Sequence, residues 1–282
     1  MKRTLIASIV ASVAASTLVA FAARTSASAQ SGASDSAGPT KAAGPAPRLA
    51  DGHPDLSGVW WPGRDLQIRP LGSPAPTPPP GAAPPRERPP SFTNLYQPWA
   101  MEKRKTLSDK DDPSLRCVPV AFGTVNVSLY GLGFVGQIVQ TAKFVVMLTE
   151  TYHGFRIIPT DGRKHRDDAA PSYRGDSVGR WEGDTLVVDE TNFTDSNWMF
   201  AEGNVSFHSD ALHIVERYRR VDAETLEVDA VVEDPKVLTG PWTVPKQTLK
   251  LAPFDQIMEV GCSGIETASL MEAASKLNYG KK

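Results

Sequence analysis

Beyond Cys117 the chain is a series of short segments in which apolar and polar residues alternate and β-branched residues are frequent. Such alternation is typical of strands, because successive side chains point to opposite faces of a sheet. The pattern predicts nine strands, at 137–141, 143–150, 155–160, 178–181, 185–191, 212–220, 225–233, 242–251 and 256–260.

Short turn sequences separate these segments, among them Asp161-Gly162, Glu182-Gly183-Asp184 and Asp222-Ala223-Glu224. Links of hairpin length join strands that run antiparallel, and Gly183 can supply the positive φ that a tight hairpin turn requires. No repeat of fixed period is present. The pattern therefore predicts one all-β domain, either an antiparallel barrel or a sandwich.

The alternation also assigns side chains to the two faces of each strand. The segment 225–233 divides cleanly, because Leu226, Val228, Ala230 and Val232 share one face and charged residues share the other. One face of this strand should therefore be buried and the other solvated. In three other segments the apolar face also carries a carboxylate, at Glu150, Glu190 and Glu216.

A carboxylate on a buried face costs free energy unless it is paired. Glu150 and Glu190 fall at the ends of their strands, so the favoured interpretation is that both are solvated. Glu216 has apolar residues on both sides of its face, and three interpretations stay open. It forms a buried pair with an arginine such as Arg217 or Arg219, a β-bulge turns it outward, or it lines a ligand cavity.

Two helices and one proline-rich segment flank the predicted strands. Eleven prolines lie within 62–90, and since proline lacks an amide donor, we expect an extended surface strap or a spacer there. Pro98 and the helix-forming residues after it predict a short helix over 98–107, and 267–277 predicts a C-terminal amphipathic helix.

The N-terminus has the three parts of a secretory signal. Lys2 and Arg3 precede an apolar run over 5–23, and Ala27-Ser28-Ala29 supplies small residues for cleavage. This order favours a signal peptide over 1–29 rather than a membrane helix. A flexible Ala/Gly/Ser/Pro leader over 30–50 and a single domain over 51–282 would follow, and the protein is expected to be periplasmic or secreted.

The charge balance argues against two kinds of partner. The chain has a formal net charge of −2, and the signal segment holds three of its 30 basic residues and none of its 32 acidic ones, so the remainder carries −5. A mildly acidic protein has no electrostatic reason to bind nucleic acid or an anionic membrane surface. Beyond the signal, no apolar run has the roughly 18 residues that a membrane span needs.

The chain has two cysteines, Cys117 and Cys262. In an oxidising compartment such a pair is most simply one disulfide, and the alternative is two separate thiols. Closing so long a loop would stabilise the fold by up to about 4–5 kcal/mol in the chain-entropy description.

Gly58-Val59-Trp60 stands where the first strand of a barrel would begin. This motif resembles the start of lipocalin-like (calycin-type) barrels, in which the tryptophan packs at the closed end beneath an arginine. The resemblance implies that Trp60 lies at the floor of such a barrel. The expected fold is then an antiparallel lipocalin-like β-barrel, with a short helix before it and a C-terminal helix.

Three further blocks, at 152–163, 177–189 and 208–218, resemble in content and order a family of exported, largely uncharacterised bacterial β-proteins. The resemblance covers roughly 117–262 and implies no particular activity. Between the first two blocks, the segment 161–176 is rich in charged and histidine side chains that the strands do not need, among them Arg163, His165, Arg166, Asp167, Asp168, Arg174 and Asp176. Such a loop is either functional, at the mouth of a barrel or elsewhere, or simply a solvated charge cluster.

The sequence lacks the signatures of several kinds of chemistry. It has no nucleophile elbow, phosphate loop or dinucleotide fingerprint, so no cofactor is expected. Its histidines show no spacing diagnostic of a metal site: His53, His153, His165, His208 and His213.

We therefore expect an exported barrel that binds a small, partly apolar molecule. If it is also an enzyme, its reaction should need only proton transfer, as in an isomerase or a lyase. The candidate residues are Glu216 as the acid or base, His153 or His213 as its proton partner, and Arg156 as the group that stabilises an anion. The alternative is a non-catalytic structural or interaction protein of the cell envelope.

Overall fold

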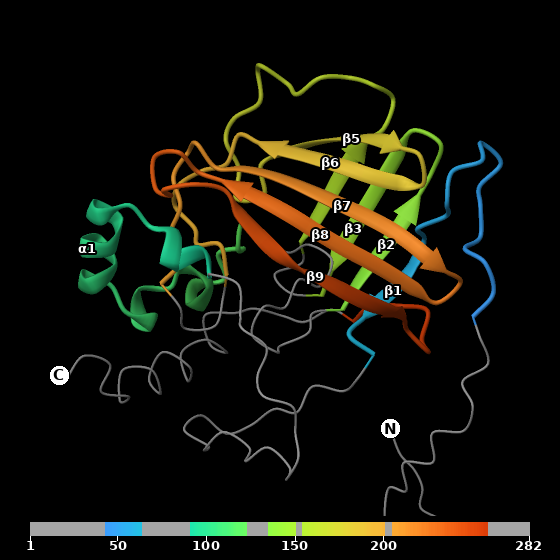
Figure 1. The fold of residues 1–282 in the computed structure, drawn as a ribbon, viewed down its shortest axis with the longest axis horizontal. Coiled ribbons are helices and arrows are strands. Elements are labelled where there is room, and N and C mark those ends of the chain that lie inside the picture. Colours follow the sequence, from blue (N-terminus) through green and yellow to red (C-terminus); the bar gives the residue numbers. More distant parts are fainter. Residues whose placement is uncertain (1–42, 64–90, 123–134, 151–153, 201–204, 259–282) are drawn as a thin grey trace, which may run out of the picture. The chain divides into compact units, whose positions relative to one another are not determined.

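A computed structural model describes residues 43–63, 91–122, 135–150, 154–200 and 205–258 (Figure 1). Within them, nine strands form one antiparallel sheet. The strands are β1 (Gly58–Trp61), β2 (Gly136–Gln140), β3 (Phe144–Thr149), β4 (Phe155–Pro159), β5 (Asp176–Glu182), β6 (Thr185–Thr191), β7 (His213–Asp222), β8 (Thr225–Glu233) and β9 (Trp242–Leu251).

The sheet curls into a nearly closed barrel (Figure 1). Its strand order is β4-β3-β2-β1-β9-β8-β7-β6-β5, so strands that follow one another along the chain are neighbours, and the first strand pairs with the last. The one interruption lies between β4 and β5, which approach each other at the two ends of the sheet. We call this interruption the seam.

The hairpin turns follow the predicted turn sequences. Glu182 pairs with Thr185 across the β5–β6 turn, where Gly183 has a φ of 60°. Asp222 pairs with Thr225 across the β7–β8 turn. The positive φ expected at Gly183 is confirmed, and these tight links keep consecutive strands antiparallel.

Inward-facing apolar residues of the strands form the core. The division predicted for β8 is confirmed, since Leu226, Val228, Ala230 and Val232 are all buried. At one end of the barrel the core continues into a cluster of aromatic rings from the segments before β2 and before β7 and from the start of β9. These rings belong to Phe92, Tyr96, Phe122, Phe200, Phe207 and Trp242.

Short helical segments precede β2. The predicted helix is confirmed as α1 (Pro98–Thr106), which follows the 3₁₀ turn η1 (Phe92–Leu95). Two further 3₁₀ turns, η2 (Asp109–Asp111) and η3 (Pro113–Arg116), come after it. The amide of Gln97, the residue before α1, donates to the carbonyl of Val237, so the start of this helix is fastened to the loop between β8 and β9.

One predicted strand is wrong. Residues 256–258 are not in a strand, and the chain leaves the sheet after Leu251 at the end of β9. The reason is topological, because both edges of β1 are already occupied, by β2 and by β9. Phe254 and Met258 consequently lie exposed on the outside of the barrel.

Several predictions fall outside the described residues. They are the signal peptide, most of the leader, the proline-rich segment over 64–90, the C-terminal helix over 267–277, and the positions of His153 and Cys262. The Cys117–Cys262 disulfide therefore stays a prediction. Across the described ranges, no helix has the length and apolar character needed to cross a membrane.

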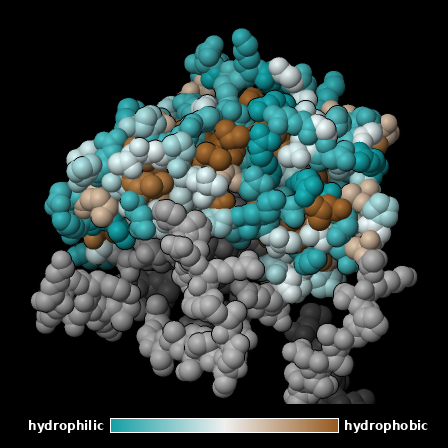
Figure 2. Space-filling view, in the orientation of Figure 1, coloured by the Kyte–Doolittle hydropathy of each residue, from teal (hydrophilic) through white to brown (hydrophobic). Residues whose placement is uncertain are grey.

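The outer surface carries mostly polar side chains with separated apolar spots on the face shown in Figure 2. The largest exposed apolar side chains on a strand are Phe155 and Ile157, on the outer side of β4. Their partners on β3 are Leu148 and Val146, which are half-buried. The outer face of these two strands is therefore apolar.

Candidate functional sites

A cluster of four polar side chains lies inside the barrel, and Arg156 on β4 is at its centre. Its Nη1 contacts Glu190 Oε1 on β6, and its Nη2 lies 2.5 Å from Glu216 Oε2 on β7. Tyr218 donates its hydroxyl to the same oxygen of Glu216 at 2.8 Å. We call these four residues the inner cluster.

Burial and charge both act on the inner cluster. Burial raises the pKa of Tyr218 well above its usual range, and the neighbouring Glu216 raises it further, so this hydroxyl keeps its proton and remains a donor. Burial opposes the charged form of Arg156, but Glu216 and Tyr218 outweigh that effect and raise the pKa of the guanidinium. The cluster thus holds one permanent cation between two carboxylates.

The inner cluster is closed to solvent. Glu216 and Tyr218 have no exposed surface, and Glu190 has 1%. A substrate could reach these groups only if the barrel opened. Among the described residues, Arg156 Nε and Glu216 Oε1 are buried without a hydrogen-bond partner, and such orphan atoms reduce what the cluster contributes to stability.

The structure decides between the interpretations of the inward carboxylates. Glu216 forms a buried pair with an arginine, but the partner is Arg156 rather than Arg217 or Arg219, whose side chains lie on the outer side of β7. The register of β7 and β8 shifts beyond Arg220, so no bulge turns Glu216 outward.

The other two carboxylates differ from each other. The expectation that Glu190 is solvated is wrong, because it lies within β6 and its partner Arg156 stabilises it in the interior. Glu150 lies just after β3, where its Oε1 accepts a hydrogen bond from the amide of Met258 at 2.8 Å.

Of the candidate catalytic residues, the structure brings Arg156 and Glu216 together. His213 is not with them, because it is an odd number of residues from Glu216 on the same strand and lies on the outer side of β7. His213 therefore cannot exchange a proton directly with Glu216 in this structure. His153 lies outside the described residues.

A second set of polar side chains lies on the outer side of the barrel and includes His213. His165 Nδ1 is 2.9 Å from Asp176 Oδ2, and its Nε2 is 2.9 Å from Asp189 Oδ1. His213 Nε2 is 3.3 Å from the other oxygen of Asp189, and its Nδ1 is 3.1 Å from Glu233 Oε2. These five residues, in which imidazoles and carboxylates alternate, form what we call the outer chain.

The outer chain favours the protonated form of His165. Partial burial works against the charged form of His165, but hydrogen bonds to Asp189 and Asp176 outweigh it and raise the pKa of this histidine. Partial burial likewise works against charged Asp189, yet the two histidines together lower its pKa. In the described part of the chain, no set of three or more such side chains is arranged to hold a metal ion, since each ring nitrogen here faces its own oxygen.

Trp60 and Arg220 occupy one end of the barrel interior. The Trp60 ring is fully buried, and the Arg220 guanidinium lies over it at 5.0 Å from the ring centre. Arg220 Nη1 donates to the carbonyls of Asp55 and Ser57, at 2.6 and 3.2 Å, and its Nη2 donates to that of Ala223. The arginine thereby ties the chain before β1 to the turn after β7, over the tryptophan.

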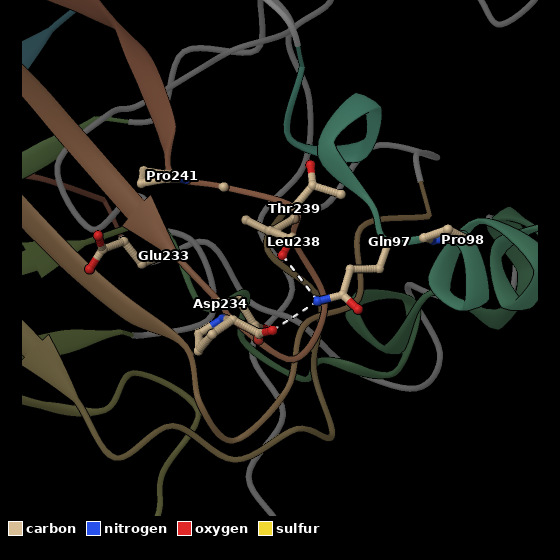
Figure 3. Close-up of a pocket in the computed structure, with 9 residues that line it drawn as sticks. Gln97, Pro98, Glu233, Asp234, Leu238, Thr239 and Pro241 are labelled. Carbon is tan, nitrogen blue, oxygen red and sulfur yellow. Dashed lines mark hydrogen bonds between the residues drawn. The ribbon is translucent and has the colours of Figure 1, made fainter.

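An open groove of about 670 Å³ lies where the loop between β8 and β9 meets the start of α1 (Figure 3). Gln97 lines the groove and donates its side-chain amide to the carbonyls of Pro235 and Leu238. Asp234 is held by the amide and hydroxyl of Ser209, both at 2.7 Å. The groove is lined by Gln97, Pro98, Glu233, Asp234, Pro235, Leu238, Thr239, Gly240 and Pro241.

Comparison of the chain with family models, with curated proteins and with solved structures gives no match. The assignment of function therefore depends on the geometry of the described residues.

Sequence reasoning missed the outer chain and the groove. Asp189, His213 and Glu233 stand at outward positions of consecutive strands, and His213 pairs with Glu233 in the register of β7 and β8. Once the pairing of the strands is known, these outward positions are enough to predict that Asp189, His213 and Glu233 lie side by side. It does not reach His165, because the loop that carries His165 has no strand register.

Proposed function

We propose that this protein is an exported β-barrel of lipocalin-like kind that binds a small, partly apolar molecule in the groove between α1 and the β8–β9 loop. The groove carries the proposal. Its volume lies within the range of small-molecule sites, which are mostly apolar with a few placed polar groups. Three prolines and Leu238 provide the apolar lining, and Gln97, Thr239 and two carboxylates provide the polar groups.

The position of Trp60 supports the lipocalin-like assignment. The resemblance implied a tryptophan after the glycine of the first strand, buried beneath an arginine. Trp60 follows Gly58 on β1, and Arg220 lies over its ring. Consecutive strands that pair everywhere except at the seam, with β1 against β9, also fit a barrel of this kind.

The lining of the groove favours one class of ligand. Glu233 has a half-exposed carboxylate, whereas Asp234 is buried and already accepts from Ser209, and the described residues that line the groove include no lysine, arginine or histidine. A carboxylate beside an apolar wall suits an amine that carries an apolar group, because the ammonium pairs with the acid while the rest of the molecule leaves water.

Binding is favoured over turnover because the inner cluster is closed. Glu216, the proposed acid or base, has no exposed surface, and Arg156 already engages both carboxylates. A general acid or base must come within hydrogen-bond reach of the group it serves. A ligand can enter the groove without any opening of the barrel.

The test uses benzylamine as a probe and benzyl alcohol as its uncharged match. Titration into labelled protein, followed by nuclear magnetic resonance, should give saturable shifts at the side-chain amide of Gln97 and at the amides of Thr239 and Gly240. Benzylamine should bind more tightly than benzyl alcohol, by up to about fivefold, since a partly exposed ion pair contributes up to about 1 kcal/mol. Absence of saturable shifts at these groups with either probe would refute the proposal.

A blocking variant checks the location. Gly240 has no atom within 4 Å of the place where a Cβ would stand, so Gly240→Phe should fold and put its ring into the groove. Gly44 is equally open and lies outside the groove, which makes Gly44→Phe the matched control. Loss of the shifts in Gly240→Phe alone places the probe in the groove, and equal binding by both variants places it elsewhere.

A further inference from the structure

We propose that His165 is a pH-dependent clamp that fastens the loop segment 161–168 to the outer wall of the barrel and releases it as the pH rises. The segment leaves β4 after Pro159 and carries seven charged or histidine side chains over its eight residues, Gly162 being the exception. Most of them point into solvent, and His165 is the residue of this segment that is partly buried.

The contacts of His165 are geometrically specific. Its two ring nitrogens each lie 2.9 Å from a carboxylate oxygen, one on β5 at Asp176 and one on β6 at Asp189. A carboxylate oxygen only accepts, so the ring can donate to both sides only when both nitrogens carry hydrogen. The neutral ring has one N–H, and its other nitrogen would then face an oxygen with no hydrogen between them.

The two other basic side chains near the ring, Arg166 and His213, each face a carboxylate as well. Asp189 on β6 also faces His213 on β7, which in turn faces Glu233 on β8. The neighbouring Arg166 lies 3.7 Å from Asp176 and donates its backbone amide to the same carboxylate at 3.2 Å. Around His165 the carboxylates thus come from the barrel wall, and the other basic side chains are Arg166 of the loop and His213 of β7.

Few other contacts hold this segment. Its described links to the rest of the chain are the Arg163 guanidinium over the Phe144 ring, at 5.6 Å from the ring centre, and the contacts of His165 and Arg166. From residue 169 onward the loop is fastened differently, because Asn192 donates to the carbonyl of Ala169 and Ser172 bonds to the backbone of the segment after β6. Release at His165 should therefore free 161–168 and leave the rest of the loop in place.

The direction of the pH effect follows from linkage. The fastened loop raises the pKa of His165, so it binds the proton more tightly than the released loop does. Fastening is fully favoured below the pKa of the released ring and is lost as the pH rises through the pKa of the fastened ring. The ratio of released to fastened loop grows about tenfold for each unit by which these two pKa values differ.

Trypsin provides a direct measurement, because Arg163, Lys164 and Arg166 place its cleavage sites within the segment. Cleavage at these sites is measured by mass spectrometry in the full chain and in a free peptide of residues 159–171, which cancels the pH dependence of the protease. The ratio of the two rates should rise severalfold between about pH 5 and pH 8, the range over which a histidine changes charge. A ratio that stays constant over this range overturns the proposal.

Two variants and one internal control make the test specific. His165→Gln cannot titrate, so its ratio should not change with pH, and a rise equal to that of the parent overturns the proposal. Asp189→Asn removes one acceptor charge and should lower the titration midpoint of the His165 ring, followed by nuclear magnetic resonance. His53, which stacks on Trp181 with ring centres 4.6 Å apart, is the control histidine, and its midpoint should be the same in Asp189→Asn and parent.

Discussion

Arg156 and Glu216 meet inside the barrel with Nη2 and Oε2 2.5 Å apart, although 60 residues separate them along the chain. Arg156 belongs to β4, at one side of the seam, while Glu216 belongs to β7 and its neighbour Glu190 to β6, beyond the other side. The two ends of the sheet are therefore joined through the interior by charged side chains. This buried network takes the place of a hydrogen-bond ladder between β4 and β5.

Replacing Arg156 with methionine should strongly destabilise the barrel. The substitution keeps an apolar side chain of similar length but leaves Glu190 and Glu216 buried without a cation. Removing one partner of a buried pair costs about 3–5 kcal/mol, which urea unfolding at neutral pH would detect as a large fall in the midpoint.

Arg217→Met is the matched control on the other side of the barrel wall. Arg217 pairs with Glu182 at 2.8 Å, and both side chains are exposed. Exposed pairs contribute about 0–1 kcal/mol, so this variant should unfold almost as the parent does. Equal losses of unfolding free energy in Arg156→Met and Arg217→Met would show that the inner cluster does not stabilise the barrel more than an exposed ion pair does.

Glu216→Gln should cost less than Arg156→Met, because Arg156 keeps Glu190 as its partner. The amide keeps the shape of the side chain and still accepts a hydrogen bond from Tyr218. We expect a loss of about 1.5–3 kcal/mol, the range for a hydrogen bond to a charged group. If the variant proves as stable as the parent in urea, Glu190 alone is a sufficient partner for Arg156, and the charge of Glu216 does not contribute to the stability of the barrel.

Much of the fold could be predicted because the strands alternate strictly and their links are short. The ranges expected for β6, β8 and β9 agree with the structure at both ends, since each is bounded by a turn sequence or a proline. The segment 256–260 has the same local composition as a strand. Local pattern cannot show that the edges of β1 are already filled, so that prediction failed.

The site was less predictable than the fold. Alternation correctly placed Glu216 on the inner face, but it cannot say which arginine crosses the barrel, and the residues nearest in sequence were the wrong ones. The sequence marks Arg156 as a candidate for a different reason, as an anion-binding group. The partners of a buried charge depend on how the sheet closes, which is a property of the whole barrel rather than of one strand.

The packing of Arg220 over Trp60 gives a prediction that separates the effect of the arginine's charge from the effect of its planar shape. Arg220→Lys keeps the positive charge but loses the planar fork that donates to Asp55, Ser57 and Ala223, and it loses the flat contact with the Trp60 ring. We expect a loss of about 1–3 kcal/mol on thermal or urea unfolding. Arg219→Lys, at an exposed side chain that pairs with Glu227, should change stability by no more than about 0.5 kcal/mol.

The cysteines give a prediction that peptide mapping can check. Protein exported to an oxidising compartment should contain a bond between Cys117 and Cys262, because the chain holds one pair of cysteines and no other partner for either. Digestion without reductant should yield the two peptides joined, and addition of reductant should separate them. Recovery of both peptides with free thiols from exported protein would contradict the pairing.

The close approach of β4 and β5 at the seam predicts the effect of adding a side chain at Gly179. A Cβ built on Gly179 of β5 would lie 2.9 Å from Ile158 Cγ2 of β4 and 3.1 Å from the methyl group of Thr160. Gly179→Val would therefore push the two ends of the sheet apart, and overpacking of this kind costs about 1–3 kcal/mol.

The control for this variant is Gly240→Ala, because Gly240 has open space where a Cβ would stand and its stability should change by no more than about 0.5 kcal/mol. Amide hydrogen exchange would show where the loss occurs. If the seam is the weak point of the barrel, exchange in Gly179→Val should accelerate first in β4 and β5 and leave β8 and β9 protected. Uniform acceleration across all nine strands would mean that the seam does not open independently of the rest of the barrel.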